Sequence, residues 1–332
     1  MKSLLCFRDA VVLDPGSMNS NAKTDLLLIA KNVIAMRNKI NTGNFSHVLV
    51  NTSIYTSAFI KLLIVLAFIP AKEREIHVFF HGGRFPVFNN IFCKIINFLI
   101  RPLMAKVKKF HFLSRVQSDG FHQLFADGET ALYANYSTAD TIWQKSGVSD
   151  ANSLKLLFVG RLVKEKGLFE LLAAIEKLSA EKKNVKLTVV GDGPELSELI
   201  KLSEKLPPGT VHFTGYLTGT ALEEVYQNAD VLALPTYHPE GFPYVVIEAM
   251  RAGLSIISTR AGALETLVQD GITGFKVKTK DIDSIVWAID KLSGDSALLA
   301  DMSNNCYRYF EENLSRSAAE IYYGKLLNEK SI

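Results

Sequence analysis

From Leu154 onward the chain alternates short apolar runs with segments of helical period. The runs are LKLLFVG, KLTVVG, VHFTG, DVLALP, LSIIST and TGFKV. This alternation predicts a parallel sheet wrapped by helices. The runs are apolar throughout rather than at every second residue, which indicates strands that are covered on both faces. We therefore predict a doubly wound α/β domain in the second half of the chain.

The first half shows the same architecture with a weaker signal. HVLVN, EIHVFF, KFHFLS and TALYAN are candidate strands, and residues 52–69 and 87–106 are candidate helices. We interpret this half as a second Rossmann-like domain. The polar segment SGVSDANS lacks periodic apolar positions and is the expected linker. The expected division is 1–148 for the first domain, 149–312 for the second, and a C-terminal helix at 313–332 that could pack back on the first.

Composition excludes several classes of protein. The 37 Lys and Arg against 34 Asp and Glu give a net charge of +3, which does not by itself indicate a nucleic-acid partner. The cysteines Cys6, Cys93 and Cys306 are far apart, so neither a disulfide framework nor a zinc site is predicted. The start lacks a signal-peptide core, and the apolar stretch 58–70 is too short to span a bilayer. We expect a cytoplasmic protein.

The residues that follow the predicted strands are unusual for plain connections. Ligands of open parallel sheets bind beyond the carboxyl ends of the strands. That rim collects glycines, aromatic residues, two cations and a carboxylate: Gly160, Arg161, Lys166, Gly191, Gly193, Gly215, Tyr216, Glu240, Gly241 and Phe242.

Each of these features has a structural alternative. Gly191 and Gly193 permit close approach of a ligand to the backbone, but a tight turn into a helix that starts at Pro194 would also require them. Arg161 and Lys166 could be solvated surface. Placed together on a rim of helix N-termini, they would suit a diphosphate, with one forked donor and one point charge.

Glu240 and Glu248 enclose seven residues, GFPYVVI. Pro243 suits the first position of a helix, so we expect a helix to begin there and to direct its amide donors toward the rim. Glu248 lies among apolar residues of that helix and is expected to be buried, where a carboxylate needs a partner. Ribose hydroxyls are one such partner, and an internal Arg or a backbone amide is the other.

These motifs together resemble the retaining nucleotide-sugar glycosyltransferases of the GT-B fold, glycosyltransferase family 4. The matching segments include FVGRLVKEKG, VVGDGPELSELI, VHFTGYLTGT and EGFPYVVIEAMRAG, in register from residue 154 to about residue 292. The resemblance implies two Rossmann-like, doubly wound parallel-sheet domains that face each other across a cleft.

The resemblance also implies roles for individual residues. Arg161 and Lys166 would contact the donor diphosphate, and Glu248 would hold the ribose hydroxyls. Glu240 would contact the sugar, together with backbone amides of the loop that follows it. Because Pro243 has no amide donor, that role falls to its neighbours. The residues expected to bind substrate are Glu248, Gly241, Phe242, Tyr244, Gly160, Gly191, Gly193, Gly215, Tyr216 and Gly16.

His81 is the expected site residue of the first domain. It follows the strand EIHVFF directly and resembles the family's histidine that approaches the transferred sugar. A histidine at a strand end can also be a purely structural hydrogen bonder. The chain departs from the family near its start, where VVLDPGSMNSN has only Gly16 in place of a glycine-rich loop. How residues 11–21 bind an acceptor is therefore open.

Asp281-Ile282-Asp283 matches the Asp-x-Asp signature of metal-dependent glycosyltransferases of another fold. It follows the last predicted strand and precedes the helical pattern IDSIVWAIDKL, where acidic residues complement the helix dipole. We interpret it as the start of a helix. No metal and no cofactor besides the nucleotide sugar co-substrate is expected.

The expected function is transfer of a sugar from a nucleotide diphosphate sugar, with UDP as the expected nucleotide, to a hydroxyl of a glycan or lipid-linked glycan, as in cell-surface polysaccharide synthesis. Arg161, Lys166, Glu240 and His81 would carry the reaction. Alternatives are a sugar-nucleotide epimerase or hydrolase on the same fold, and a non-catalytic scaffold subunit.

Residues 84–118 contain seven basic and no acidic residues. The basic residues are interleaved with Phe, Ile, Leu and Met, a composition typical of a helix in a lipid interface. We expect an anionic membrane surface as a partner of this segment, with Pro102 kinking or ending the helix. The competing interpretation is that the apolar residues pack on the first domain's sheet.

Overall fold

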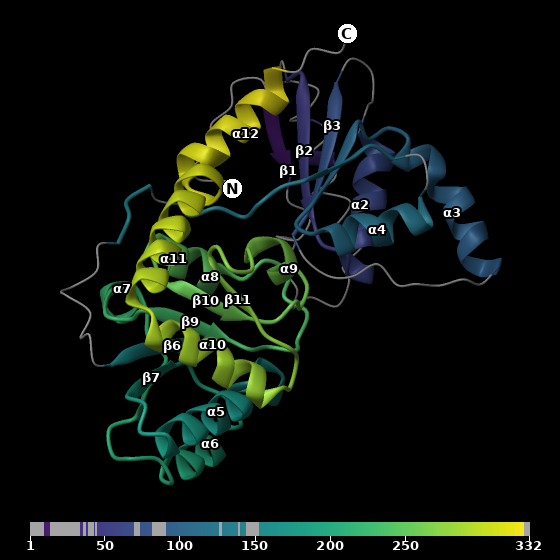
Figure 1. The fold of residues 1–332 in the computed structure, drawn as a ribbon. Helices are drawn as coiled ribbons and strands as arrows, with labels where there is room; N and C mark the ends of the chain where they lie inside the picture. Colours follow the sequence, from purple (N-terminus) through teal and green to yellow (C-terminus); the bar gives the residue numbers. More distant parts are fainter. Residues whose placement is uncertain are drawn as a thin grey trace. The chain divides into compact units, whose positions relative to one another are not determined.

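The computed structural model describes residues 10–13, 34–35, 38, 43, 45–69, 74–81, 91–125, 128–138, 140–143 and 153–328. The chain forms two compact units (Figure 1). Unit 1 comprises residues 1–134 and 320–332, and unit 2 comprises residues 135–319. Both are parallel-sheet, Rossmann-like α/β domains, as the alternating pattern predicts.

The division between the units lies earlier than the expected boundary at residue 148. Residues that precede the polar segment are already hydrogen-bonded within unit 2. The amide of Ser137 donates to the carbonyl of Leu314 at 2.7 Å, and the amide of Trp143 donates to the carbonyl of Arg251 at 3.1 Å. These bonds assign Ser137 and Trp143 to the second unit. At the other end of the chain, residues 320–332 group with unit 1.

Unit 1 contains a five-stranded parallel sheet with the order β1-β2-β3-β4-β5. Its strands are β1 (Ala10–Leu13), β2 (His47–Thr52), β3 (Glu75–Phe80), β4 (Lys109–Phe112) and β5 (Thr130–Leu132). Its helices are α2 (Thr56–Phe68), α3 (Ile91–Met104), α4 (Arg115–Leu124) and the end of α12 (Arg316–Asn328). Each described strand lies beside its neighbour in the chain.

The two faces of this sheet are covered differently. One face, with Val50, Val78 and Phe112, packs with the apolar side of α2 into a core of fully buried side chains. The opposite face carries alternate residues of the same strands. There Phe79 lies 5.6 Å from the ring of Tyr323, which comes from α12. The C-terminal helix therefore packs on the sheet of unit 1.

Unit 2 contains a six-stranded parallel sheet with the order β11-β10-β9-β6-β7-β8. Its strands are β6 (Leu154–Val159), β7 (Val185–Val190), β8 (Val211–Gly215), β9 (Val231–Leu234), β10 (Ser255–Ser258) and β11 (Gly274–Lys276). The first strand lies in the middle, and the order reverses between β6 and β9. In such sheets ligands bind at this reversal, beyond the carboxyl ends of the strands.

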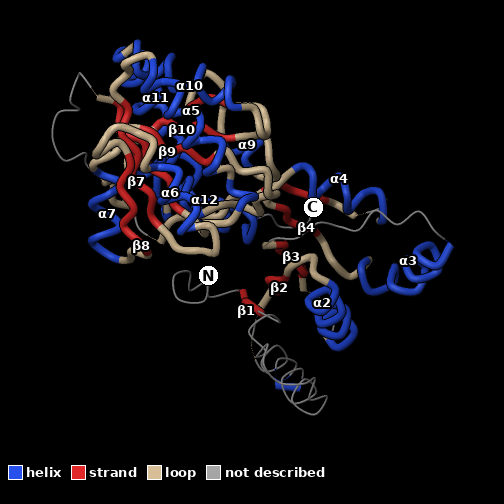
Figure 2. Tube along the Cα trace, turned by 90° about the horizontal axis from the view of Figure 1, so that it is seen from below, coloured by secondary structure: helices blue, strands red, loops and turns tan. Residues whose placement is uncertain are grey.

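Helices cover both faces of the unit 2 sheet (Figure 2). Because parallel crossovers are right-handed, the reversal of strand order places α5 and α8 on opposite faces. The helices are α5 (Leu168–Ala180), α6 (Leu196–Ser203), α7 (Gly219–Gln227), α8 (Tyr244–Arg251), α9 (Leu264–Leu267), α10 (Ile282–Gly294) and α11 (Ser296–Tyr309). A short 3-10 helix, η2 (Lys164–Lys166), and a short π-helix, η3 (Phe310–Leu314), also belong to unit 2.

Three helix boundaries differ from the prediction. α8 begins at Tyr244, and Pro243 caps it with φ −72° and ψ 121° instead of occupying the first helical position. α6 begins at Leu196, after Pro194, with Glu195 as its N-cap. α3 contains Pro102 and ends at Met104, two residues before the expected end at 106. Within the described ranges, none of the helices combines the length and the apolar character needed to cross a bilayer.

Candidate functional site

The loops at the carboxyl ends of β6, β7 and β8 are joined by backbone hydrogen bonds. The amide of Leu162 donates to the carbonyl of Asp192 at 2.9 Å, and the amide of Gly191 donates to the carbonyl of Gly215 at 2.8 Å. The first bond links the loop after β6 to the loop after β7, and the second links the loop after β7 to the end of β8. The parts of the predicted rim that follow these three strands are therefore joined through their backbones.

The rim glycines differ in why they are needed. Gly191 has φ 136°, and a Cβ there would lie 1.9 Å from the carbonyl oxygen of Gly160. A Cβ on Gly193 would lie 2.3 Å from the carbonyl oxygen of Leu162. Both glycines are thus required by the packing of the two loops, which is the structural alternative raised above. Gly215 has φ 72° with open space around it, so only its backbone conformation favours glycine.

Gly160 is the exception among these glycines. A Cβ there would meet only ring atoms of Phe158, at 3.8 Å, which is ordinary contact. The fold around Gly160 does not explain the missing side chain. Close approach of a ligand to the backbone is the other reason for a glycine at such a position.

The expected cation Lys166 is paired inside the site. Its Nζ lies 2.6 Å from Oε1 of Glu240, and both side chains are largely buried. Arg161, five residues earlier, is exposed on the rim. Lys166 ends η2, and Gly167 follows it with φ 76°, where a Cβ would lie 2.2 Å from the carbonyl oxygen of Pro235. The structure thus brings together two residues that lie far apart in the sequence.

The position of Glu240 is fixed by its backbone. Its carbonyl accepts a hydrogen bond from the amide of Ala263 at 2.8 Å, and it forms a β-bridge with Gly262. A Cβ on Gly262, at φ 67°, would lie 2.2 Å from that carbonyl. Gly262 is therefore a site residue that the sequence analysis missed, although it also follows a strand, β10. Its position in the short segment Ala-Gly-Ala was the available signal.

The loop after β9 is tied to the turn that carries Lys166. The hydroxyl of Thr236 and the amide of Tyr237 both donate to the carbonyl of Glu165 at 2.9 Å. Thr236 is fully buried. β6 and β9 are neighbours in the sheet, so these bonds and the Lys166–Glu240 pair lie at the reversal of strand order.

Glu248 is partly buried in α8, and Oε2 accepts a hydrogen bond from the hydroxyl of Tyr226 at 2.8 Å. Burial raises the pKa of Glu248, opposed by that hydrogen bond and by the charge of Arg251. Burial and the nearby carboxylate raise the pKa of Tyr226, so its hydroxyl keeps its proton. The internal partner is a tyrosine, whereas the sequence analysis considered an Arg or a backbone amide.

Trp143 completes the surroundings of Glu248. Its ring lies 5.5 Å from that of Tyr226, and the guanidinium of Arg251 lies 4.2 Å above it. Arg251 also donates to the hydroxyl oxygen of Thr141 at 2.7 Å. The start of the unit 2 chain therefore packs beside α8 and holds the residues around Glu248 in place.

The remaining residues of the site loops are more open. Tyr216 is 78% exposed and Tyr244 is 57% exposed. Gly241 and Phe242 are partly buried, and the carbonyl of Phe242 accepts a hydrogen bond from Nδ2 of Asn135 at 3.4 Å. Tyr216 follows the end of β8, whereas Gly241, Phe242 and Tyr244 lie at the start of α8.

Asp281 and Asp283 start helix α10, as predicted. The side chain of Asp281 accepts a hydrogen bond from the amide of Ser284 at 3.0 Å and caps the helix. Asp283 lies in the first turn and pairs with Lys177 at 2.6 Å. The Asp-x-Asp pattern is thereby accounted for as a helix N-terminus.

In unit 1, His81 directly follows β3 and is exposed. Its Nδ1 lies 2.8 Å from the hydroxyl of Tyr133, and its amide donates to the carbonyl of Thr52 at 2.8 Å. Tyr133, which the sequence analysis did not single out, thus orients the imidazole. Gly16 lies outside the described residues.

Comparison with known proteins identifies relatives in sequence and in structure. The family model described as glycosyl transferases group 1 matches residues 140–309. The chain is 32% identical over 184 residues to an uncharacterised glycosyltransferase of Methanocaldococcus jannaschii, covering 53% of this chain and 46% of that protein. It is 32% identical over 167 residues to the capsular polysaccharide biosynthesis glycosyltransferase CapM of Staphylococcus aureus, covering 48% and 41%. The chain thus spans less than half the length of these curated relatives.

Two solved structures share the fold across both units. The crystal structure of Anabaena HepE in complex with UDP has a TM-score of 0.71 at 18% identity, covering 92% of this chain and 82% of that one. A glycosyltransferase from Rickettsia africae has a TM-score of 0.71 at 18% identity, covering 95% and 85%. At this level of identity the likeness establishes the GT-B architecture, and the activity has to be argued from the residues of the site.

Proposed function

Because the chain belongs to the glycosyl transferases group 1 family, we propose that it transfers a sugar from a UDP-sugar to a hydroxyl of a glycan or lipid-linked glycan. The observation that carries the proposal is the contact between Lys166 and Glu240 at the reversal of strand order. It places a cation and a carboxylate where an open parallel sheet binds its ligand.

The proposed donor complex follows from the positions around that contact. Arg161 on the rim and the amide donors at the start of α8 would face the diphosphate, and Glu248 would accept hydrogen bonds from the ribose hydroxyls. When a donor binds, the Lys166 ammonium would contact both Glu240 and the nearest phosphate oxygens. Glu240 could then also accept hydrogen bonds from the sugar hydroxyls, while Lys166 still balances its charge.

The transfer step needs stabilisation of opposite charges. Breaking the bond between sugar and diphosphate leaves negative charge on the phosphate oxygens and positive charge on the sugar ring. Arg161, Lys166 and the N-terminus of α8 would stabilise the phosphate charge without a metal ion, as fixed groups that need no reorganisation. We assign no protein nucleophile. The departing phosphate oxygen would take the proton of the incoming hydroxyl on the same face, which retains the anomeric configuration.

The test is product analysis with a panel of UDP-sugars, in the presence and absence of lipid-linked glycans. Mass spectrometry should show a glycan that gains one sugar residue as UDP appears, and NMR of the product should show the anomeric configuration of the donor. An epimerised or hydrolysed sugar nucleotide that forms equally well without glycan would favour a sugar-nucleotide epimerase or hydrolase. Absence of any product with every donor would favour a scaffold subunit.

We further propose that α3 attaches the protein to an anionic membrane surface at the cytoplasmic face. Phe98 is 75% exposed and Leu99 is 67% exposed, next to the exposed basic residue Arg101. Ile100 and Leu103, in contrast, pack against the core of unit 1. Packing therefore accounts for one part of the helix and leaves two large apolar side chains in water.

Vesicle flotation tests membrane attachment, and the contacts of the basic residues decide which variants to use. Lys106 donates to the carbonyl of Leu66 at 2.9 Å and Lys109 pairs with Glu129 at 2.9 Å, so both also support the fold. Changing Phe98 and Leu99 to Ser leaves these contacts intact. Flotation with anionic vesicles at low salt should be lost in that variant and kept by the native protein. A native protein that never floats would disprove attachment.

A further inference from the structure

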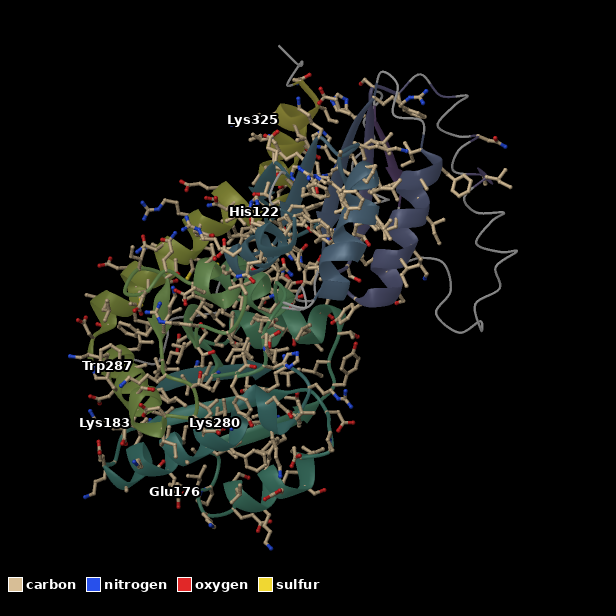
Figure 3. The ribbon with its side chains drawn as sticks, turned by 90° about the vertical axis from the view of Figure 1, so that its right-hand side faces the viewer. His122, Glu176, Lys183, Lys280, Trp287 and Lys325 are labelled. Atoms are coloured by element: carbon tan, nitrogen blue, oxygen red, sulfur yellow. The ribbon has the colours of Figure 1, made fainter. Side chains whose placement is uncertain are left out.

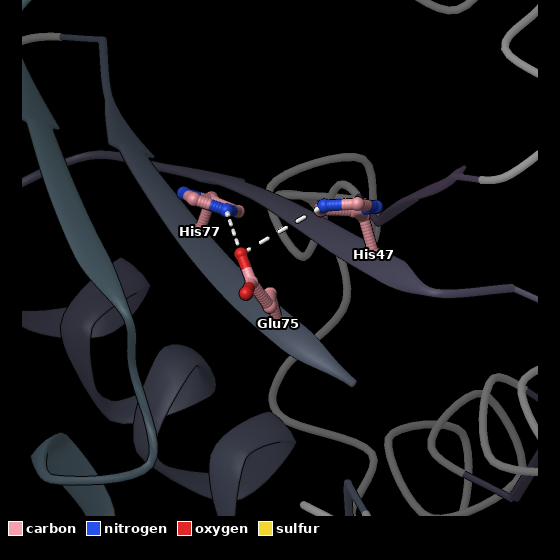
Figure 4. Close-up of side chains that lie close together, drawn as sticks. All are labelled: His47, Glu75 and His77. Atoms are coloured by element: carbon pink, nitrogen blue, oxygen red, sulfur yellow. Dashed lines mark ion pairs between the residues drawn. The ribbon is translucent and has the colours of Figure 1, made fainter. Parts of the chain in front are cut away.

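Two histidines and a glutamate lie together at the amino ends of β2 and β3 in the unit 1 sheet (Figure 4). His47 is the first residue of β2, and Glu75 is the first residue of β3 and its register partner; His77 follows on the same face. Nε2 of His47 and Nε2 of His77 each lie 3.8 Å from Oε2 of Glu75. All three ligand atoms lie within 4.8 Å of one another.

The two Nε2 atoms are buried and have no hydrogen-bond partner among the described residues. His47 is 7% exposed and His77 is 2% exposed. The ion-pair distances to Glu75 are too long for hydrogen bonds. A buried imidazole nitrogen that is left without a partner costs free energy, so something should satisfy these two.

The other nitrogen of each ring is already held. Nδ1 of His47 lies 2.8 Å from the hydroxyl of Ser46. Nδ1 of His77 lies 3.2 Å from Nε2 of His111, whose own Nδ1 lies 2.8 Å from the hydroxyl of Tyr322. With the protons on the Nδ1 atoms, both Nε2 lone pairs point toward Glu75. Metal-binding histidines are oriented in this way by a hydrogen bond from the second ring nitrogen.

We propose that His47, Glu75 and His77 form a zinc site in unit 1. Two imidazole nitrogens and one carboxylate oxygen are ligands typical of Zn²⁺, whereas Mg²⁺ and Ca²⁺ prefer oxygen ligands alone. Tetrahedral ligands at zinc distances lie about 3.3 Å from one another. Each nitrogen must therefore approach Glu75 by about half an ångström, and the two nitrogens, which lie within 4.8 Å of each other, must reach the same separation. The fourth position remains for water.

The position of this site indicates a structural role. His47 and Glu75 begin their strands, whereas His81 follows the last residue of β3, at the other end of the sheet. A bound ion would join the starts of β2 and β3. The zinc site does not depend on the proposed transfer reaction. If the chain binds no zinc, the proposed donor site in unit 2 is not affected.

The test is zinc binding by the tag-free full chain, stripped of metal with a chelator. Titration with ZnCl₂ against a chromophoric chelator should give one tight site per chain, and excess MgCl₂ should not compete. His47→Gln and Glu75→Gln should weaken binding about 100-fold or more. Ser46→Ala, which removes the hydroxyl that lies against Nδ1 of His47, should weaken it about 10-fold.

His122 supplies the matched control. It lies on α4, is exposed, and contacts Thr130 at 3.0 Å (Figure 3). His122→Gln should bind zinc like the native chain, and circular dichroism should show that every variant is folded. Cobalt bound to the native chain should give the visible spectrum of a tetrahedral site. Equal zinc affinity in the native, His47→Gln and Glu75→Gln proteins, or no stoichiometric binding by the native chain, would overturn the proposal.

Discussion

The hydroxyl of Tyr226 donates a 2.8 Å hydrogen bond to the carboxylate of Glu248. Tyr226 is fully buried, and Glu248 is partly buried one turn from the end of α8. One oxygen of the carboxylate is thus satisfied within the fold, although burial still raises the pKa of the group. Because burial disfavours the charge of Glu248, we expect this carboxylate to bind a ligand.

The hydrogen bond between Tyr226 and Glu248 predicts that a change at Glu248 affects protein stability and nucleotide binding in opposite directions. Glu248→Gln removes a charge that burial disfavours, and the amide oxygen of Gln can still accept the Tyr226 hydrogen bond. The variant should have the same or a higher free energy of unfolding at neutral pH, measured by denaturant titration. A clear loss of stability would mean that Glu248 holds the fold together.

The pH dependence of that difference can be derived from the direction of the shift. Because the pKa of Glu248 is raised in the folded state, folded protein binds the proton more tightly than unfolded protein. The stabilising contribution of that proton is fully present below the unfolded value of 4.5 and is lost as pH rises through the folded pKa. The advantage of Glu248→Gln should therefore appear as pH rises above 4.5 and vanish below it. An advantage that is independent of pH would contradict the assignment.

Gly160 and Gly191 offer a matched pair of substitutions. Gly160→Ala meets only ordinary contacts, so its free energy of unfolding should be unchanged or raised by up to about 1 kcal/mol. Gly191→Ala places a Cβ against a carbonyl at a positive φ and should cost about 1–3 kcal/mol. If a donor approaches the backbone at Gly160, the alanine there should weaken UDP binding in a fully stable protein. Native affinity in Gly160→Ala would remove the ligand explanation for this glycine.

The Lys166–Glu240 pair should behave as a coupled unit. Lys166→Met leaves the carboxylate of Glu240, 11% exposed, without its cation and should lower the free energy of unfolding by about 1–3 kcal/mol. Adding Glu240→Gln should restore most of that loss. Turnover should stay low in both variants, because each lacks a group proposed to face the donor. Normal turnover in the double variant would show that the pair is only structural.

Sugar transfer should not need a divalent metal. Asp281 and Asp283 are engaged in the start of α10, and the phosphate charge is assigned to Arg161 and Lys166. EDTA should leave turnover unchanged in Glu75→Gln, which separates the proposed zinc site from the reaction. Turnover of that variant that is abolished by EDTA and restored by manganese would make the transfer metal-dependent.

The strands of unit 2 and the cap at Asp281 could be predicted because their signals are local. Fully covered strands are continuously apolar, and a helix N-terminus is marked within a few residues. The partners that complete the site carry no such signal. Tyr226 lies 22 positions from Glu248, and Lys166 lies 74 positions from Glu240. Only the order of strands in the sheet brings them together.

The zinc candidate shows the same limit. Glu75 and His77 are separated by one residue, but His47 lies on the preceding strand, and the register of β2 and β3 brings it opposite Glu75. The boundary between the units was placed too late because Trp143 and Ser137 hydrogen-bond to elements far along the chain. Long-range pairing of this kind is not encoded in local composition.

The most direct test of the donor site is calorimetric titration with UDP, UMP and uridine. UDP should bind most tightly and uridine most weakly, because we propose that Arg161 and Lys166 face the diphosphate. Arg161→Ala should remove most of the difference between UDP and UMP, while Glu248→Gln should weaken all three by about 1.5–3 kcal/mol. Equal affinity of the native protein for UDP and uridine, or an unchanged preference for UDP over UMP in Arg161→Ala, would contradict a diphosphate site at this rim.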